Sequence, residues 1–266
     1  MIPKKIHYCW FGNNPLPEIA LKCMASWKKF CPDYEIIGWD ESNCDMTTNP
    51  FVEQAYQEKK WAFVSDYFRL KVVEEQGGIY LDIDVELLKP LDDLLELDGF
   101  MGFELGKSNS IATGLGFGAV ANHPVIKALR ENYENSPFIK ADGSLDTTPC
   151  PQRDTKILVG YGLVQNNQKQ SIRGITFFPS DYFSPTGFFG EQNFSDNTYS
   201  IHHFNASWFT DRQRRAMDRK KKIRSVTGQK IGDKIDLLFL AWDEFKYSGI
   251  KALLVKVKNR IFGYGN

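Results

Sequence analysis

The feature that most constrains the fold of this chain is the nine-residue stretch from Gly77 to Val85. Apolar side chains alternate there with Tyr80, Asp82 and Asp84, a period of two residues that predicts a strand with one apolar face. Both carboxylates are then expected on the opposite face, where unpaired negative charges would repel each other and resist burial. Hard divalent cations such as Mg²⁺ and Mn²⁺ take oxygen ligands. The stretch therefore predicts a metal site that also receives phosphate oxygens.

Two other structures would fit the same stretch, a solvated strand face and a turn that carries two exposed acids. Aspartate is a poor strand former, so two of them on one strand face would be unusual. The apolar residues that follow, Val85, Leu87 and Leu88, are not typical of a surface tip. The sequence favours the metal site over both alternatives.

The residues before this stretch predict an α/β fold. Apolar strand patterns at 6–12 and 34–39 flank a stretch of helical spacing at 17–30, and a strand–helix–strand order is typical of a parallel sheet. Residues 51–76 also have helical spacing, in one or two pieces, and Gly77-Gly78 supplies a stop.

An acid and a base lie near the end of that last helix. Asp66 and Arg69 are three residues apart and therefore neighbours on one helix face. They form either an ordinary surface ion pair or part of a site, in which Arg69 pairs with phosphate oxygens and Asp66 accepts sugar hydroxyls. Because the aspartate strand follows directly, helix and strand are expected to converge on one pocket.

The second half of the chain has weaker signals. We expect a helix at 124–133, a loop at 141–155, irregular aromatic loops over 175–200 and a last strand at 198–204. From residue 211 the pattern becomes helical and basic.

The charge distribution divides the chain in the same place. Residues 211–266 contain 15 Lys and Arg against 6 Asp and Glu, a balance of +9, and because the whole chain is neutral, residues 1–210 carry −9. A length of 266 residues suits one α/β domain with a helical appendage. We therefore expect a catalytic domain at 1–210 and a basic helical extension at 211–266.

Five cysteines without a CxxC pair indicate reduced thiols and a cytoplasmic setting. The N-terminus has no apolar run of signal-peptide length, and no stretch approaches the ~20 apolar residues that span a bilayer.

Trp10, at the end of the first expected strand, either stacks on a planar base or belongs to the core. His202 and His203 lie near a strand end, where a histidine can ligate a metal.

These pieces occur together, and in this order, in one enzyme class. The chain resembles the DxD-containing glycosyltransferases of the sugar-transfer family thirty-two, and more distantly the glucosylating domains of clostridial toxins. The resemblance covers about residues 1–210, and its motifs are the segments 6–10, 65–69, 77–84 and 202–208.

The resemblance implies a GT-A fold with a mostly parallel central sheet, a nucleotide-sugar donor, a divalent metal and retention of anomeric configuration. It places Trp10 on the nucleobase and makes Asp66 and Arg69 partners of the donor sugar and phosphate. Donor contacts are also implied for Tyr80, Asp82 and Trp208.

The metal is expected to be Mn²⁺ or Mg²⁺, held by Asp84 with Asp82. In the toxin-like pattern an acid and a serine precede the late tryptophan, whereas this chain offers Ala206 and a shifted Ser207. His203 is therefore the candidate for the further metal ligand. Catalytic roles are expected of Asp82, Asp84 and Arg69.

The function implied is transfer of a hexose or N-acetylhexosamine, favoured as a UDP-sugar, to an oligosaccharide or lipid-linked glycan in surface (capsular) polysaccharide synthesis. The alternatives are a glycoside hydrolase, which would also use two carboxylates, and a non-catalytic module that binds nucleotide sugar or metal. No nucleic-acid motif accompanies the basic tail, so no nucleic-acid partner is expected.

The basic extension has two interpretations. Basic amphipathic helices suit an anionic membrane surface, which would make the enzyme peripheral on the inner face of the membrane. Alternatively, the helices pack on the domain and their charges are solvated.

Overall fold

The computed structural model describes residues 1–187, 190–204, 211–228, 231–243 and 246. The chain forms two compact units, Met1–Trp208 and Phe209–Asn266. Each unit is described by itself.

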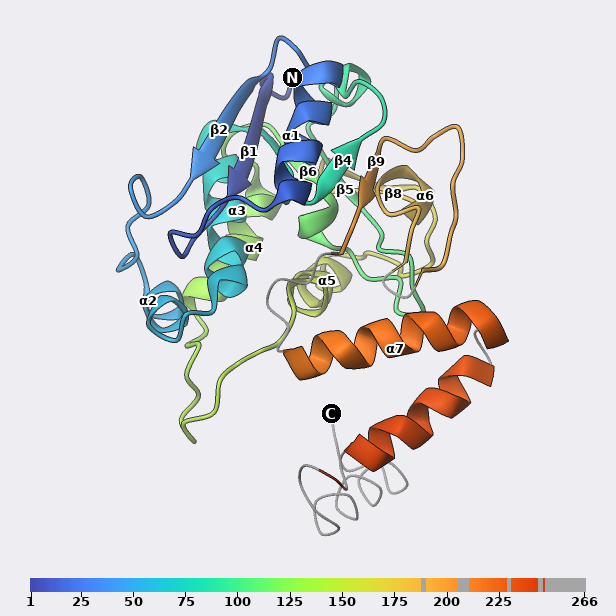
Figure 1. Ribbon diagram of the computed structural model, residues 1–266. Helices are drawn as coiled ribbons and strands as arrows, with labels where there is room; N and C mark the ends of the chain where they lie inside the picture. The colour runs from blue at the N-terminus through green and yellow to red at the C-terminus, as the bar shows by residue number, and fades with distance from the viewer. Residues whose placement is uncertain (188–189, 205–210, 229–230, 244–245, 247–266) are drawn as a thin grey trace. The chain divides into compact units, whose positions relative to one another are not determined.

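Unit 1 is built on a seven-stranded sheet with the order β2-β1-β3-β6-β5-β8-β7 (Figure 1). Its strands are β1 (Lys5–Cys9), β2 (Glu35–Trp39), β3 (Gly78–Tyr80), β5 (Gly99–Gly102), β6 (Phe117–Ala119), β7 (Gln170–Ile172) and β8 (Ile175–Phe178). The pairs β1–β2, β1–β3 and β5–β8 are parallel, whereas β6 and β7 run antiparallel to their neighbours. Five strands therefore point the same way, which confirms the predicted α/β fold with a mostly parallel central sheet.

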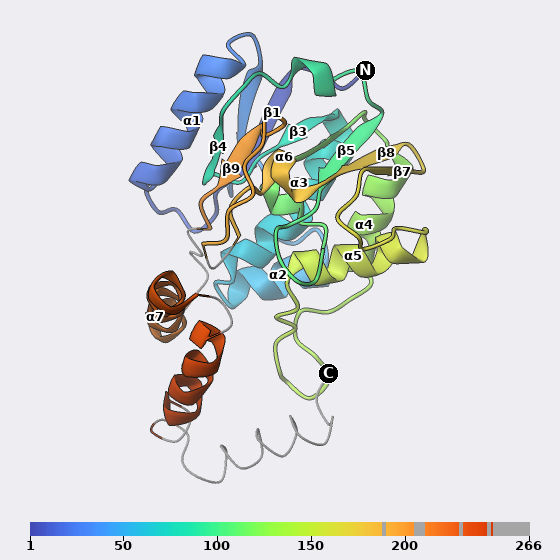
Figure 2. The same cartoon turned by 90° about the vertical axis from the view of Figure 1, so that its right-hand side faces the viewer.

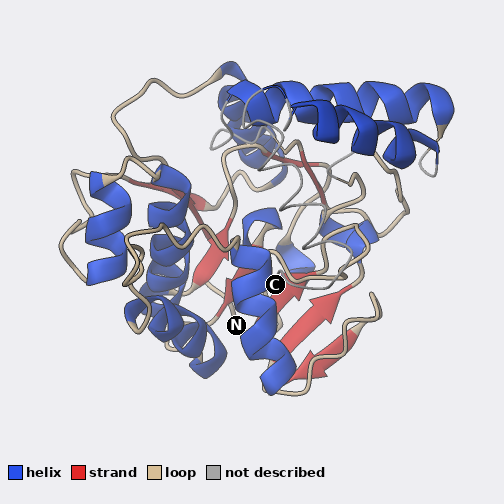
Figure 3. Ribbon diagram, turned by 90° about the horizontal axis from the view of Figure 1, so that it is seen from below, coloured by secondary structure: helices blue, strands red, loops and turns tan. Residues whose placement is uncertain are grey.

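Helices cover both faces of this sheet, and Figure 2 shows α1 and α4 on opposite sides of it; Figure 3 colours the elements by type. The helices of unit 1 are α1 (Glu18–Phe30), α2 (Pro50–Gln57), α3 (Trp61–Gln76), α4 (Pro124–Glu134), α5 (Cys150–Gly160) and α6 (Ser180–Phe183), with 3₁₀ turns at Asp92–Leu94 and Thr113–Leu115.

Two hydrophobic cores follow from the alternation of side chains along the strands. In β3, Ile79 packs in the core that contains α1, and its neighbour Tyr80 packs in the core that contains α2, α3 and α4. In β5, Phe100 and Met101 divide between the two cores in the same way. Each strand thus ties one helical layer to the other.

The helical stretch predicted at 51–76 is two helices, α2 and α3, and Lys59, with φ +55°, interrupts the helical backbone between them. The Asn49 side chain accepts a hydrogen bond from the Val52 N–H at 3.0 Å and starts α2. Gly77 ends α3 with φ +64°, and a Cβ there would lie 2.9 Å from the Ala121 nitrogen. Glycine is therefore required where α3 turns into β3.

The strand predicted through the aspartates is wrong in its extent. β3 ends at Tyr80, residues 83 and 84 form a turn, and β4 (Val85–Leu87) then pairs with β9 (Ser200–His202) in a separate two-stranded sheet. The poor strand propensity of aspartate and the Val85 N–H bond to the Asp82 carbonyl, 3.0 Å, favour the turn. The carboxylates therefore do not share a pleat face.

Two loop predictions also need correction. Residues 150–155, expected as loop, begin α5, because Pro151 lies in the first turn, where its missing N–H costs nothing. The region 175–200, expected as irregular, contains β8 and α6.

Unit 2 contains α7 (Asp211–Thr227) and a second helix at 231–243. In the described part of the chain, no helix combines the length and the apolar character needed to cross a bilayer.

Candidate active site

Asp82 and Asp84 lie in the turn between β3 and β4, just after the C-terminal end of β3. Asp84 is buried, and Asp82 is partly exposed. The turn is held on one side by β3 and on the other by β4, whose Val85 carbonyl accepts a hydrogen bond from the buried Trp27 indole at 2.7 Å. The sheet and α1 thus fix both ends of the motif.

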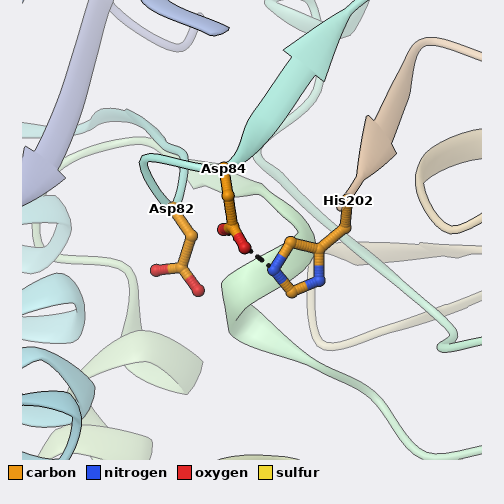
Figure 4. Close-up of side chains that lie close together, drawn as sticks. All are labelled: Asp82, Asp84 and His202. Atoms are coloured by element: carbon orange, nitrogen blue, oxygen red, sulfur yellow. Dashed lines mark hydrogen bonds and ion pairs between the residues drawn. The ribbon is translucent and has the colours of Figure 1, made fainter. Parts of the chain in front are cut away.

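A histidine distant in sequence completes the cluster (Figure 4). The antiparallel pairing of β4 with β9 sets Val85 opposite His202, and His202 Nε2 lies 3.1 Å from Asp84 Oδ1. One ligand atom from each of Asp82, Asp84 and His202 lies within 4.8 Å of the others. Two carboxylates and an imidazole at this spacing form a donor set suited to Mn²⁺ or a similar divalent ion.

The histidine beside the aspartates is His202, not the predicted His203. Successive side chains of a strand point to opposite sides, and His203 accordingly turns away, with its Nε2 2.8 Å from Glu86. The assignment of the further metal ligand therefore moves by one residue.

The surroundings of His202 test whether a cation fits. Burial lowers the pKa of this imidazole, but Asp84, Asp82 and Glu104 outweigh burial, and the pKa lies above its ordinary value. Its buried Nδ1 has no hydrogen-bond partner among the described residues. The site thus stabilises positive charge next to Asp84, and a divalent cation would replace the imidazolium proton in that role.

Arg69 joins the helix to the turn, as the convergence of helix and strand predicted. Its Nη2 lies 3.2 Å from both Asp66 Oδ1 and Asp82 Oδ1, and its guanidinium stacks 5.1 Å from the Tyr80 ring centre. The Tyr80 hydroxyl donates to Asp82 at 2.8 Å. Arg69 is only 4% exposed, so this is a buried network and not a solvated surface pair.

Sequence patterns gave no signal for a second buried acid, Asp154 on α5. It accepts hydrogen bonds from Thr113 at 3.0 Å and from the Tyr133 hydroxyl at 3.3 Å. Burial raises the pKa of Asp154 to about 7 and that of Asp66 to about 6. Arg69 and Arg153 both lower the pKa of Asp66, but burial outweighs them.

Gly114 and Cys150 were also not singled out for this site. Gly114 packs directly on Asp82, where an added Cβ would collide with the carboxylate. The Cys150 sulfur lies 3.6 Å from Arg69 Nη1. Only the fold brings these residues together, since Gly114 lies 30 positions and Cys150 66 positions after Asp84.

The two tryptophans expected at the donor have different outcomes. Trp10 follows β1, is half-buried and donates its Nε1–H to the Asn14 carbonyl at 2.6 Å, so base stacking stays a prediction for it. Trp208 lies outside the described residues, and its donor contact stays a prediction as well.

Residues 17–100 match the family model described as "Glycosyltransferase sugar-binding region containing DXD motif". This region contains Asp66, Arg69 and the aspartate turn. His202 lies beyond it.

Relatives point to the same class. The chain is 30% identical over 160 residues to mannosyl phosphorylinositol ceramide synthase CSH1 of Saccharomyces cerevisiae, an alignment of 54% of this chain and 40% of that protein. It is 25% identical to the uncharacterized glycosyltransferase L373 of Acanthamoeba polyphaga mimivirus, over 73% of this chain and 77% of the relative. A solved structure of the PaToxG glycosyltransferase aligns with a TM-score of 0.47 and 21% identity, over 60% of this chain and 68% of that one.

The chain spans less than half the length of the yeast relative. The matched region and the motif within it nevertheless bear out the resemblance found in the sequence. Over residues 17–100 this protein is therefore similar to the DXD-containing sugar-binding region of glycosyltransferases.

Proposed function

We propose that this protein is a metal-dependent glycosyltransferase that moves a hexose or N-acetylhexosamine from a nucleotide sugar to an acceptor glycan. One observation carries the proposal: Asp82 and Asp84 of the turn, which lies inside the matched region, and His202 of β9, which lies beyond it, offer ligand atoms within 4.8 Å of one another. Asp84 and Asp82 raise the pKa of His202 against the effect of burial, which supports a cation at this place.

The hard step in glycosyl transfer is departure of a nucleoside diphosphate from the anomeric carbon. A bound Mn²⁺ or Mg²⁺ would act as a Lewis acid and offset the charge that develops on the leaving phosphate. Asp82, Asp84 and His202 would hold the ion. Arg69 holds Asp82 and Asp66 in place, so that their carboxylates are preorganised beside the donor.

Asp66 would contact the donor sugar, as the resemblance implies. It is buried against Arg69, and burial raises its pKa to about 6. A carboxyl of this kind can accept a sugar hydroxyl hydrogen bond when ionised and donate one when protonated. Donor contacts of Tyr80 are indirect, because its hydroxyl is engaged by Asp82.

The finer assignments rest on resemblance. A UDP-sugar donor and retention of configuration follow from the likeness to toxin-type enzymes, as do base stacking by Trp10 and a donor contact of Trp208 through its indole N–H. A lipid-linked glycan acceptor is supported by the relative whose name places its reaction on an inositol phosphoceramide, and surface polysaccharide synthesis stays part of the proposal.

Hydrolysis of a glycoside is less consistent with the geometry. In a glycoside hydrolase the two carboxyl groups lie about 5–10 Å apart on either side of the bond that is cleaved. Here Asp82, Asp84 and His202 each offer one ligand atom within 4.8 Å of the others (Figure 4). Carboxylates that converge on one point suit an ion better than the two sides of a sugar ring.

The test is release of nucleoside diphosphate from a panel of UDP-, GDP- and other nucleotide sugars by the full chain, with Mn²⁺, Mg²⁺ or EDTA. We expect one of the donors to release nucleoside diphosphate when Mn²⁺ or Mg²⁺ is present and not in EDTA. Such release is expected without an acceptor because a site that transfers sugar also hydrolyses its donor slowly. Asp84→Asn should reduce release at least a hundredfold, and Asp142→Asn, on an exposed loop, should not.

Two outcomes would contradict the proposal. Full activity of Asp84→Asn in EDTA would remove the metal role. Tight binding of a nucleotide sugar without any turnover, with or without added glycan acceptors, would favour a non-catalytic module.

A further inference from the structure

In the described part of unit 2, several charged side chains lie between two helices, and several apolar side chains are exposed. On the helix at 231–243, Asp233, Asp236 and Asp243 recur at helical spacing on one face, and this face packs against α7. Arg219 of α7 lies 2.9 Å from Asp243 and 3.6 Å from Asp236. Asp236 is only 3% exposed, so the contact between the two helices is ionic.

The opposite face of the same helix is apolar. Its side chains recur at i, i+4, i+7, i+8 and i+11 and are Ile231, Ile235, Leu238, Phe239 and Trp242; we call them the apolar stripe. Leu238 is 72% exposed and Ile231 58%. Four of the five, all but Ile231, line an open apolar hollow.

This arrangement is the opposite of the usual one for two packed helices in water. A helix pair in water is normally held by apolar contacts and presents its charges to solvent. Exposing the stripe forgoes several kcal/mol of hydrophobic stabilisation at about 25 cal/mol per Å². A contiguous exposed stripe of this kind marks a surface that docks on something apolar.

The charges around the stripe identify what it docks on. The described part of α7 carries lysine and arginine well in excess of acids, and Arg215 and Lys222 are exposed, as is Lys234 on the second helix. An apolar stripe on a unit with exposed cations matches the interface of an anionic bilayer, where hydrocarbon lies under negative headgroups.

We propose that unit 2 docks on the surface of an anionic phospholipid bilayer, with the apolar stripe inserted at the level of the acyl chains and Arg215, Lys222 and Lys234 at the headgroups. The helix lies on the membrane and does not span it. This inference is independent of the glycosyltransferase proposal, because it rests on unit 2 alone.

The experiment is flotation of the full chain with phosphatidylcholine vesicles that contain either no anionic lipid or about 30 mol % phosphatidylglycerol. We expect binding to the anionic vesicles, weakened when NaCl is raised from about 0.1 M to about 0.5 M. Leu238→Asp should lower the partition coefficient at least tenfold, and the pair Arg215→Glu and Lys222→Glu should lower it about tenfold on anionic vesicles only.

Leu21→Asp is the matched control, because Leu21 is a leucine of α1 in unit 1 that is 58% exposed. It should leave binding unchanged. Circular dichroism establishes that the variants fold, and donor hydrolysis without vesicles reports the active site separately.

Three outcomes would overturn the inference. The first is that the protein floats with neither kind of vesicle. The second is that Leu238→Asp does not reduce flotation. The third is a concentration-dependent dimer in gel filtration that Leu238→Asp dissociates. The last would assign the stripe to a second copy of the chain.

Discussion

At the scale of single residues, His202 and His203 are neighbours at the end of β9, which includes His202 and stops before His203. This difference of one position sends one imidazole to Asp84 and the other to Glu86. Both histidines carry the same chemistry, so only their direction decides which of them can hold a cation.

Replacing each histidine in turn tests this. We expect His202→Ala to weaken Mn²⁺ binding at least tenfold, measured by calorimetric titration, because one of three ligands is lost. His203→Ala removes only a half-buried contact to Glu86 and should leave the affinity within about twofold. The reverse order of effects would restore His203 as the ligand.

Gly114 tests how closely the site is packed. Because a Cβ at Gly114 would collide with the Asp82 carboxylate, Gly114→Ala should displace Asp82 and lower the rate of donor hydrolysis at least tenfold. Gly106→Ala is the control, since no atom lies within 4 Å of a Cβ there. Equal rates for the two variants would show that Asp82 does not need its present position.

At the scale of elements, α1 supports the aspartate turn through β4. The fully buried Trp27 donates its indole N–H to the Val85 carbonyl at 2.7 Å, directly after Asp84. The turn is therefore anchored by a hydrogen bond from a helix that lies 58 residues earlier in the chain.

We expect Trp27→Phe to lower the free energy of unfolding by about 1–3 kcal/mol, because the Val85 carbonyl is left buried without its donor. Urea unfolding measures the loss, and Mn²⁺ affinity should fall with it. Trp39→Phe, which loses a 3.2 Å hydrogen bond between β2 and His7 of β1 but none to the aspartate turn, should leave Mn²⁺ affinity unchanged. A loss of affinity in both variants would indicate a general loosening of the fold.

At the scale of the whole molecule, buried acids make stability depend on pH. Asp154 faces Asp66 and Arg69 on α3, Tyr133 on α4 and Thr113. Burial raises its pKa to about 7. In the folded state its proton is therefore held at pH values where the unfolded chain has already lost it.

The sign follows from this difference. The contribution is fully present below the unfolded pKa of about 4 and is lost as the pH rises through about 7. We expect the melting temperature in EDTA to fall between pH 5 and pH 8, and to fall less in Asp154→Asn. Asp142→Asn changes an exposed acid whose pKa is lowered by Ser144, so it should keep the wild-type slope. An unchanged slope in Asp154→Asn would show that Asp154 is ionised throughout.

Local patterns were sufficient where one segment contains the whole signal. The strand–helix–strand opening, the helix that ends at Gly77, and the pairing of Asp66 with Arg69 three residues on are all properties of short stretches, and the structure contains them. The aspartate stretch misled in its conformation, because its period of two fits a strand while aspartate itself favours the turn that forms.

The sequence by itself determined the α/β class, the matched sugar-binding region and the acids of the candidate site, because these follow from periodicity and motif within neighbouring residues. Only the tertiary structure decided that His202 rather than His203 meets Asp84, that Asp154 and Gly114 belong to the same cluster, and that the second helix of unit 2 turns its apolar face outward. Each of these depends on contacts between segments far apart in the chain, or on which side of an element faces its neighbour, and no local pattern contains that information.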